Sequence, residues 1–383
     1  MKDGVKLATA IVVAVFIVTV FTYALQNNDN DERPTLEATI VQSEHGMGLT
    51  LDVTLEDLES IGAYYGCDLD IAFGDSHYTV AFVDSHNGVA NYSIGLTYSE
   101  RYGGLSISLS GGDLTHETGM GDGSVIKIKV KGDNEFYKLT PNYRAGSTDK
   151  RADYDDDQKF GNYRELKGGN LKDDTFYRSS NPWNHSSERA QFSDDYYREL
   201  GVENLISFDL TMEKVQKRCE ELPDAYATSV YEAGKVHASA LSPSVFKHPD
   251  QASFVLESIL DTEGTVGMFC TYGKDRTGAY CAMIEALAGA SYEEIRADFM
   301  ESMCNYYHFE KDTPEYEAVA HMYIDRVLWL FKHYEYIDNY TAVDWSKMSF
   351  DDYVPEEVFT EYLINVCGVP GELIDDVKER ITA

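Results

Sequence analysis

The stretch TVGMFCTYGKDRTGAYCAMIEALAGA, from Thr265 to Ala290, joins a short apolar segment, a glycine-bearing turn and a long apolar segment. TVGMF has the length and composition of a buried strand, whereas TGAYCAMIEALAGA is long enough for a helix. Upstream, ENLISFDL (203–210) predicts another strand, and ASFVLESIL (252–260) has the i, i+4 apolar spacing of a helix. Strands that alternate with helices predict an α/β domain whose parallel sheet is flanked by helices.

The turn between this strand and this helix has the composition of an anion-binding site. A loop that leads into a helix N-terminus exposes backbone N–H groups, and the helix dipole adds partial positive charge there. The same field can lower the pKa of a thiol from about 8.5 to between about 3.5 and 7.5, which would make Cys270 a nucleophile. Arg276 can hold two phosphate oxygens with its planar guanidinium, and Gly273 and Gly278 allow the backbone to curl tightly. The five residues between Cys270 and Arg276 let the loop wrap a tetrahedral oxyanion above the sulfur.

CTYGKDRTG resembles the Cys-x5-Arg signature of the cysteine-dependent protein tyrosine phosphatases, in particular the HCxAGKDRTG form of the bacterial tyrosine and lipid-like phosphatases. NYRELKGG (162–169) is similar to the NFRDLGG phrase of that branch, and YRSSNP (177–182) to its YRS phrase. GASYEEIRADFMES (289–302) followed by YYHF (306–309) fits the helix pair after the loop in this family. The resemblance covers residues 161–383 and implies a tyrosine-phosphatase-like domain without a metal or organic cofactor.

The resemblance also implies a role for each residue of the loop. Cys270 matches the nucleophile, Arg276 the phosphate clamp, and Thr277 the hydroxyl that assists the thiolate as leaving group in the second step. The residues expected to bind the phosphate, through loop amides and the clamp, are Thr271, Tyr272, Gly273, Lys274 and Arg276.

A carboxylic acid is expected to protonate the departing oxygen of the substrate. The family branch points to the acid inside the loop, Asp275, and the alternative is Asp209 at the end of the strand ENLISFDL. Asp194 and Asp195 are third choices that fit the start of a helix better. General acid catalysis is worth typically about 10² to 10⁴ in rate, so mutation can test the assignment.

Other interpretations of the loop residues stay open. Asp275 fits equally well as a structural partner of Arg164, Arg178 or Lys274. Lys274 can widen tolerance for multiply anionic substrates such as phosphoinositides, or it can be a solvated lysine. Tyr163 and Arg164 fit structural support of the loop better than catalysis.

Two residues depart from the family pattern. Phe269 stands where the family has a histidine that orients the loop and helps to hold the thiolate, so the pKa of Cys270 is expected to be higher. Tyr272 replaces a small residue, which narrows or reshapes the mouth of the pocket. Phe269 permits an alternative function, a catalytically weak pseudophosphatase that binds phosphorylated ligands.

Composition limits the partners of the chain. A formal net charge of -34 repels nucleic acid and anionic lipid headgroups, so nucleic acid is not an expected partner. The six cysteines form no CxxC pair, and no histidine stands at metal-ligand spacing from them. This pattern argues against a structural zinc site and against a disulfide-rich scaffold.

Residues 1–28 are predicted to be a transmembrane anchor. LATAIVVAVFIVTVFTYAL (7–25) is long enough to cross a bilayer as a helix of about 20 residues. Lysines precede it and DNDER (29–33) follows it, which places the remainder outside the cytoplasm. The predicted location is the cell membrane, single-pass with an extracytoplasmic catalytic domain. A signal peptide cleaved near Thr22–Ala24, and hence a secreted protein, is the alternative.

The remaining chain is divided into three parts. Residues 29–140 predict a β-rich domain of unknown role, 141–160 a linker, and 161–383 the phosphatase-like domain. The β-rich part has alternating segments and one helix, with Thr54 as its N-cap. It weakly resembles, in strands and turns only, the C-terminal β-domain of the SAM hydroxide adenosyltransferases, which implies no such activity. The strands predicted there are ATIVQ, DLDIAF, YTVAFV, YSIGLTY, LSISLS and VIKIKV.

The sequence therefore predicts a phosphoric monoester hydrolase that works through a phosphocysteine intermediate. The expected substrates are phosphotyrosine or phosphoserine proteins, or a phosphoinositide. The pseudophosphatase is the alternative function.

Overall fold

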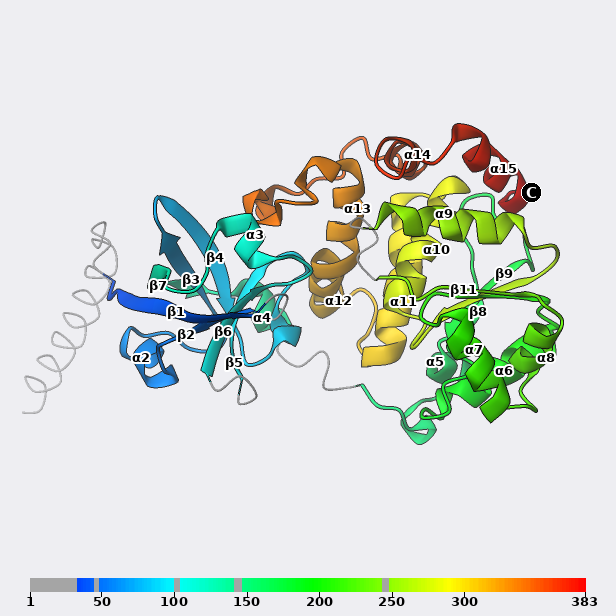
Figure 1. Cartoon of the computed structure of the whole chain (residues 1–383), viewed down its shortest axis with the longest axis horizontal. Helices are drawn as coiled ribbons and strands as arrows, with labels where there is room; N and C mark the ends of the chain where they lie inside the picture. Colours follow the sequence, from blue (N-terminus) through cyan, green and yellow to red (C-terminus); the bar gives the residue numbers. More distant parts are fainter. Residues whose placement is uncertain (1–32, 45–47, 100–103, 141–146, 243–247) are drawn as a thin grey trace, which may run out of the picture.

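The computed structural model describes residues 33–44, 48–99, 104–140, 147–242 and 248–383. These residues form a β-barrel in the N-terminal part and an α/β domain in the C-terminal part, which lie next to each other along the long axis of the molecule (Figure 1). The predicted membrane anchor, residues 1–28, lies outside the described residues. None of the helices within the described ranges combines the length and the apolar character that a membrane crossing requires.

The barrel closes through seven strands in the order β1-β2-β6-β5-β4-β3-β7. Leu69 and Ile71 of β3 and Ile126 and Ile128 of β7 are fully buried at alternate positions, as expected for a strand with one face in a core. The strands predicted from alternation are present, but β2 was missed, because it has only four residues and is defined by its pairing with β1 and β6. The strand bounds are β1 (Leu36–Glu44), β2 (Gly48–Leu51), β3 (Cys67–Phe73), β4 (Ser76–Phe82), β5 (Ile94–Ser99), β6 (Gly104–Leu109) and β7 (Val125–Asp133).

The prediction of one helix in the β-rich part is incomplete. Thr54 caps α2 (Leu55–Ser60) as predicted, because its side chain accepts from the backbone N–H of Asp57. Two further helices, α3 (Leu114–Thr118) and α4 (Glu135–Leu139), have five residues each. They are too short to show a helical period, and both begin at a side-chain cap.

The C-terminal sheet has the order β11-β10-β12-β9-β8. Its strands β9 to β12 are parallel, which confirms the predicted parallel sheet, while the two-residue β8 runs antiparallel to β9. The bounds are β8 (Arg164–Glu165), β9 (Phe176–Ser180), β10 (Asn204–Ser207), β11 (Val236–Ala238) and β12 (Val266–Cys270).

Helices cover both faces of this sheet, as Figure 1 shows. Along β12, Met268 and Cys270 point into the core with α9 and α10, whereas Phe269 points into the core with α6, α7 and α8. The helix bounds are α5 (Asp157–Gly161), α6 (Arg189–Leu200), α7 (Met212–Glu221), α8 (Tyr226–Glu232), α9 (Pro249–Leu260), α10 (Asp275–Leu287), α11 (Tyr292–Tyr307), α12 (Pro314–Ala320), α13 (Arg326–Lys332), α14 (Pro355–Asn365) and α15 (Gly371–Ile381).

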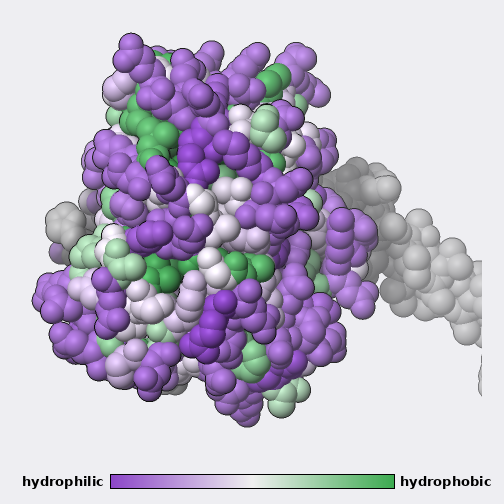
Figure 2. All heavy atoms as spheres, turned by 90° about the vertical axis from the view of Figure 1, so that its right-hand side faces the viewer, coloured by the Kyte–Doolittle hydropathy of each residue, from purple (hydrophilic) through white to green (hydrophobic). Residues whose placement is uncertain are grey.

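The later part of the predicted linker packs on the α/β domain. Arg189 is 1% exposed, and its guanidinium binds Asp149 at 2.8 Å and the carbonyl oxygen of Thr148 at 2.6 Å. The outer face of this domain is largely hydrophilic, with hydrophobic residues in small groups (Figure 2), which agrees with the acidic composition.

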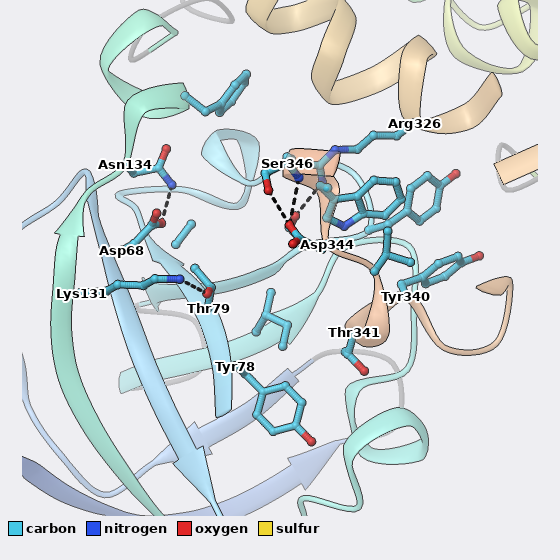
Figure 3. Close-up of a pocket in the computed structure, with 18 of the residues that line it drawn as sticks. Asp68, Tyr78, Thr79, Lys131, Asn134, Arg326, Tyr340, Thr341, Asp344 and Ser346 are labelled. Carbon is cyan, nitrogen blue, oxygen red and sulfur yellow. Dashed lines mark hydrogen bonds between the residues drawn. The ribbon is translucent and has the colours of Figure 1, made fainter. Parts of the chain in front are cut away.

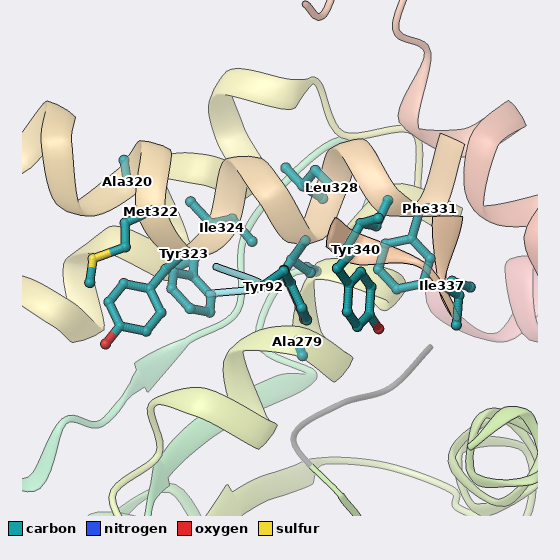
Figure 4. Packing of buried hydrophobic residues seen from close by; sticks show 14 of the residues in the cluster. Tyr92, Ala279, Ala320, Met322, Tyr323, Ile324, Leu328, Phe331, Ile337 and Tyr340 are labelled. Atoms are coloured by element: carbon teal, nitrogen blue, oxygen red, sulfur yellow. The ribbon is translucent and has the colours of Figure 1, made fainter. Parts of the chain in front are cut away.

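The barrel and the α/β domain share a buried contact. Tyr92, from the barrel, packs against Tyr340 with ring centroids 4.6 Å apart, and both lie near α13 (Figure 4). The backbone N–H of Thr341 donates to Glu117 of the barrel at 3.1 Å. The segment after α13 therefore links the two parts.

Candidate active site

Cys270 ends β12, the middle strand of the α/β sheet. Its neighbours β9 and β10 run parallel to it, so the carboxyl ends of the three strands meet at one edge. Ligands of open parallel sheets bind at this edge. Cys270 is 5% exposed, so its thiol is largely shielded from bulk water.

The loop after Cys270 is closed by Gly273. The backbone N–H of Gly273 donates to the carbonyl oxygen of Cys270 at 3.1 Å, and Gly273 adopts a φ of +65°. A Cβ atom here would lie 2.3 Å from the carbonyl oxygen of Ser179. Both the left-handed conformation and the lack of space therefore require glycine at this position.

The first turn of α10 begins directly after this loop, at Asp275. Lys274 occupies the N-cap position, and its side chain makes no capping hydrogen bond. The first N–H groups of a helix have no partner within the helix and carry the positive end of its dipole. The sequence predicted the amides of Thr271 to Arg276 as donors to an oxyanion; of these, the N–H of Gly273 is used within the loop, where it donates to the carbonyl oxygen of Cys270.

Two side chains from distant segments brace the back of the loop. Asn162 donates through Nδ2 to the carbonyl oxygens of Tyr272 and Gly273 at 3.0 and 3.2 Å. Arg178 donates through Nη2 to the carbonyl oxygen of Gly273 at 2.9 Å. Both side chains are fully buried. They hold the loop in one shape before any ligand binds, which is the preorganisation that oxyanion sites need.

A buried ion cluster holds these bracing residues in place. Asp298 of α11 accepts from Arg164 Nε at 2.8 Å and also binds Arg178 Nη1. Ser302 Oγ accepts from the same two guanidinium groups at 2.9 and 3.1 Å. Burial by itself raises the pKa of Asp298, but the two positive charges outweigh burial and lower it. The sequence indicated a supporting role for Arg164 but did not single out Asn162 or Asp298.

Glu285 of α10 lies next to this cluster and is fully buried. Neither carboxyl oxygen has a hydrogen-bond partner among the described residues. Burial and the negative charge of Asp298 raise the pKa of Glu285 well above its ordinary value, although Arg178 and Arg164 oppose this. Glu285 is therefore protonated under conditions in which an exposed glutamate is ionised.

Arg276 and Thr277 take no part in the hydrogen bonds and ion pairs that support the loop. The guanidinium of Arg276 is half-buried and forms no hydrogen bond or ion pair with any residue that the structure describes. Thr277 is fully buried, and its hydroxyl likewise lacks a hydrogen-bond partner within the described ranges. The cation and the hydroxyl that the sequence assigned to substrate chemistry thus both lack a hydrogen-bond or ion-pair partner among the described residues.

The two candidate acids differ in their surroundings. Asp209 lies just after β10 and accepts from Thr271 Oγ1 at 2.9 Å, directly beside the nucleophile in the chain. It also accepts from Ser207 Oγ at 3.1 Å. Asp275 is about half exposed and pairs with Lys274 Nζ at 2.6 Å. Asp275 thus has the structural partner Lys274, whereas Arg164 and Arg178 pair with Asp298 instead.

Lys274 points away from solvent. It is 5% exposed, and its Nζ lies 5.5 and 5.2 Å from the ring centroids of Tyr306 and Tyr307. Burial lowers its pKa, but the charge and hydrogen bond of Asp275 together with the nearby Tyr307 and Tyr323 outweigh burial, so the pKa is raised. The interpretation of Lys274 as a solvated lysine is wrong.

Asp194 does not start its own helix, contrary to the prediction, because α6 begins at Arg189. Its carboxylate instead accepts from the backbone N–H groups of Tyr226 and Ala227, each at 2.8 Å, at the start of α8. Asp194 is therefore engaged as a cap for another helix. A sequence pattern could not reveal this contact between segments more than thirty residues apart.

The two departures from the family pattern have different surroundings. Phe269 is fully buried and packs edge-to-face against Trp183, with ring centroids 5.6 Å apart. It thus anchors the end of β12 in the apolar core on the face opposite to Cys270. Tyr272 is half-buried and packs against Tyr306 with ring centroids 4.8 Å apart.

The parallel sheet, the loop at the end of its middle strand and the buried cluster of Arg164, Arg178 and Asp298 behind that loop define an α/β domain with a supported strand–loop–helix unit around Cys270. The family model for the tyrosine phosphatase family matches residues 159–382, more than half of the chain. The chain belongs to the tyrosine phosphatase family, and this membership supports a phosphatase activity. No cluster of three or more His, Cys, Asp or Glu side chains suited to a metal ion is present among the residues that the structure describes.

Other comparisons add little. No curated protein matches the chain. Among 22 matching chains of solved structures is an uncharacterized conserved protein from Thermotoga maritima, with 12% sequence identity and a TM-score of 0.24. The match covers 25% of this chain and 36% of that chain, so this chain spans about a third of that protein.

Proposed function

We propose that this protein hydrolyses phosphate monoesters through a phosphocysteine intermediate. One observation carries this proposal. Cys270 ends the middle strand, and Arg276, six positions later in the chain, has a guanidinium without a hydrogen-bond or ion-pair partner among the described residues. A braced loop with a thiol at one end and an unpaired guanidinium at the other suits a bound phosphate group. Membership of the tyrosine phosphatase family supports the same activity.

The proposed reaction has two steps. The loop amides and Arg276 bind the three terminal oxygens of the phosphate, and the thiolate of Cys270 attacks phosphorus. The phosphorus–oxygen bond to the leaving group breaks, and an aspartic acid gives its proton to the departing oxygen. Water then attacks phosphocysteine, the same carboxylate takes a proton from it, and Thr277 donates a hydrogen bond to the leaving thiolate. Inorganic phosphate is released and the free enzyme is restored.

Two carboxylates compete for the role of proton donor. Asp275 is indicated by the family resemblance, but its carboxylate is held by Lys274. Asp209 contacts the loop itself through Thr271. The contact of its carboxylate with the loop favours Asp209 as the proton donor, and Asp275 then serves to neutralise a buried lysine.

The position of Lys274 also bears on the substrate. Its ammonium group is buried, paired with Asp275 and packed against tyrosine rings. A lysine held in this way does not reach a second phosphate group on a ligand. We therefore propose phosphotyrosine or phosphoserine proteins as substrates rather than a multiply phosphorylated phosphoinositide. Rates with a phosphotyrosine peptide and with a phosphoinositide test this choice.

Release of phosphate from p-nitrophenyl phosphate by the purified protein tests the proposed activity. Cys270→Ser should abolish turnover while the protein stays folded, because serine is a far weaker nucleophile than a thiolate. The pseudophosphatase alternative predicts no turnover by either protein. Equal turnover by both proteins would contradict the proposed role of Cys270.

We also propose that residues 1–28 anchor the protein in a membrane, with the phosphatase domain outside the cytoplasm. The support is the apolar segment 7–25 with lysines before it and acidic residues after it. The full chain should remain in the membrane fraction after an alkaline wash, and a chain lacking residues 1–28 should not. Recovery of the full chain in the wash would contradict the anchor.

A further inference from the structure

A cavity of about 690 Å³ lies between the barrel and the segment that follows α13. Figure 3 shows its two sides: Tyr78, Thr79 and Lys131 belong to barrel strands, whereas Arg326, Tyr340 and Asp344 belong to the C-terminal part. Cavities of about 300 to 1,000 Å³ at domain interfaces are typical of small-molecule sites. This cavity has no part in the chemistry proposed for Cys270.

Arg326 is the unusual residue of this cavity. It is 7% exposed, and its Nη1 donates to the carbonyl oxygen of Asn91 at 2.5 Å and to Ser93 Oγ at 2.6 Å. Its Nε is buried without a hydrogen-bond partner, and no carboxylate forms an ion pair with Arg326 within the described part of the chain. Burial lowers the pKa of Arg326 to about 9, against a small opposite effect of Tyr92. A buried cation without an anion is costly.

The acidic residues of the cavity do not neutralise Arg326, because they have other partners. Asp344 accepts from Ser346 Oγ at 2.6 Å and pairs with Lys347 at 2.9 Å. Asp133 pairs with Lys138 at 2.7 Å, and Asp68 accepts from Asn134 at 2.8 Å. Lys131, the other lysine or arginine of the lining, is exposed to solvent and donates to Thr79 at 2.6 Å. Arg326 is therefore the buried cation of the lining that no carboxylate among the described residues neutralises.

An aromatic ring packs against this guanidinium. Its Cζ lies 4.5 Å from the ring centroid of Trp345, and Trp345 in turn stacks on Tyr92 with centroids 6.2 Å apart. Tyr92 is a bulky residue held at a φ of +61°, a conformation that costs about 1 to 3 kcal/mol. Such strain is commonly retained where a binding site depends on it.

We propose that this cavity binds a small organic anion: a carboxylate or phosphate group is held by Arg326, and a flat apolar ring lies among Trp345, Tyr340 and Tyr78. An oxyanion supplies the missing negative charge and can accept from the unpaired Nε, in the two-point geometry that guanidinium groups favour. The aromatic side chains supply the apolar surface that fixes the orientation of the ligand.

Binding of benzoate and of phenylphosphonate to the full-length protein tests this proposal, measured by calorimetry and by tryptophan fluorescence. Both probes should bind, and Arg326→Met should weaken binding by about tenfold or more, as for loss of a charged hydrogen bond. Arg326→Lys keeps the positive charge but loses the two-point hydrogen-bonding geometry of the guanidinium, so it should weaken binding less than Arg326→Met does. Lys131→Met is the matched control in the same cavity and should change the affinity by less than about threefold.

A second variant guards against a folding defect of Arg326→Met. Trp345→Leu removes the ring but leaves the hydrogen bonds of Arg326 to the barrel, and it should also weaken binding of both probes. Arg276→Met separates this cavity from the phosphatase site, because it should leave benzoate binding unchanged. No binding of either probe up to about 10 mM would overturn the proposal. The proposal would also be overturned if Arg326→Met and Trp345→Leu both bound the probes as tightly as the unchanged protein. It would likewise be overturned if Arg276→Met alone lost benzoate binding.

Discussion

The phosphatase loop and the interdomain cavity differ in whether a carboxylate compensates the charge of their buried guanidinium groups. Under the loop, Arg164 and Arg178 share the carboxylate of Asp298, and both also donate to Ser302. At the cavity, Arg326 donates only to neutral oxygens of the barrel among the described residues. Burial is similar in the two regions, so the difference lies in charge compensation.

This difference distinguishes arginines that stabilise the fold from arginines that can bind a ligand. A buried ion pair with additional hydrogen bonds holds a neighbouring element in place, and removal of one partner is strongly destabilising. A guanidinium without a carboxylate is available to an anion from solution. Arg276 resembles Arg326 in this respect, since both lack an ion-pair partner in the described parts of the chain. The following experiments test this distinction.

The largest effect is expected for Arg276→Met. The turnover of p-nitrophenyl phosphate, as kcat/KM, should fall by about 10³, the scale at which a transition-state arginine acts. The free energy of unfolding should change by less than about 0.5 kcal/mol, because no described partner loses a contact. Initial rates and urea denaturation of the same samples measure both. A large loss of stability would instead show that Arg276 stabilises the fold, as Arg164 and Arg178 do.

Asp298→Asn, unlike Arg276→Met, should strongly lower the free energy of unfolding. It leaves Arg178 buried without a carboxylate and leaves Arg164 with Glu301 alone, at 3.7 Å, which should lower the free energy of unfolding by about 3 to 5 kcal/mol. Urea denaturation followed by circular dichroism measures this loss. Asp325→Asn is a matched control, since Asp325 is also a buried carboxylate and pairs with Arg296 at 2.9 Å. The control should lose stability but keep kcat, because it does not touch the loop braces.

Asp209→Asn and Asp275→Asn distinguish the two candidate acids. Loss of the true acid should slow the hydrolysis of phenyl phosphate about 10²-fold more than the hydrolysis of p-nitrophenyl phosphate. Phenol is the poorer leaving group, so its departure depends more on protonation. We expect this pattern for Asp209→Asn. Asp275→Asn should mainly lower stability, because Lys274 then lies buried without a carboxylate. The reverse pattern would assign the acid to Asp275.

Glu285→Gln should leave the loop contacts in place, and its effect on the free energy of unfolding should depend on pH. The folded-state pKa of Glu285 is raised above its unfolded value, so the folded protein binds more protons and becomes less stable as pH rises above about 4.5. Glutamine removes this penalty. Its stabilisation should grow with pH by up to about 1.4 kcal/mol per unit until the folded-state pKa is reached. Urea midpoints from pH 4 to 8 measure the trend, and a pH-independent difference would contradict it.

Local patterns predicted much of the fold. The strand–loop–helix unit around Cys270 and the N-cap at Thr54 are set by neighbours in the chain, and the structure contains both. The closure of the barrel was not predictable in this way, because β2 gains its strand character from pairing with β1 and β6.

The braces of the loop and the cavity depend on distant contacts. Arg178 and Asp298 are 120 positions apart in the chain, and Arg326 and Asn91 are 235 apart. The motif around Cys270 indicated which loop residues to examine, but a single sequence does not show which charges compensate one another. The roles assigned to Cys270, Arg276 and Thr277 remain predictions from that motif.

The central claim is that Cys270 forms a covalent bond to phosphorus during turnover. The most direct test is rapid acid quenching of the enzyme with p-nitrophenyl phosphate, followed by mass spectrometry of its peptides. The account predicts one phosphoryl group on the peptide that contains Cys270, and none in Cys270→Ser. A phosphoryl group on another residue, or undiminished turnover by Cys270→Ser, would contradict the account.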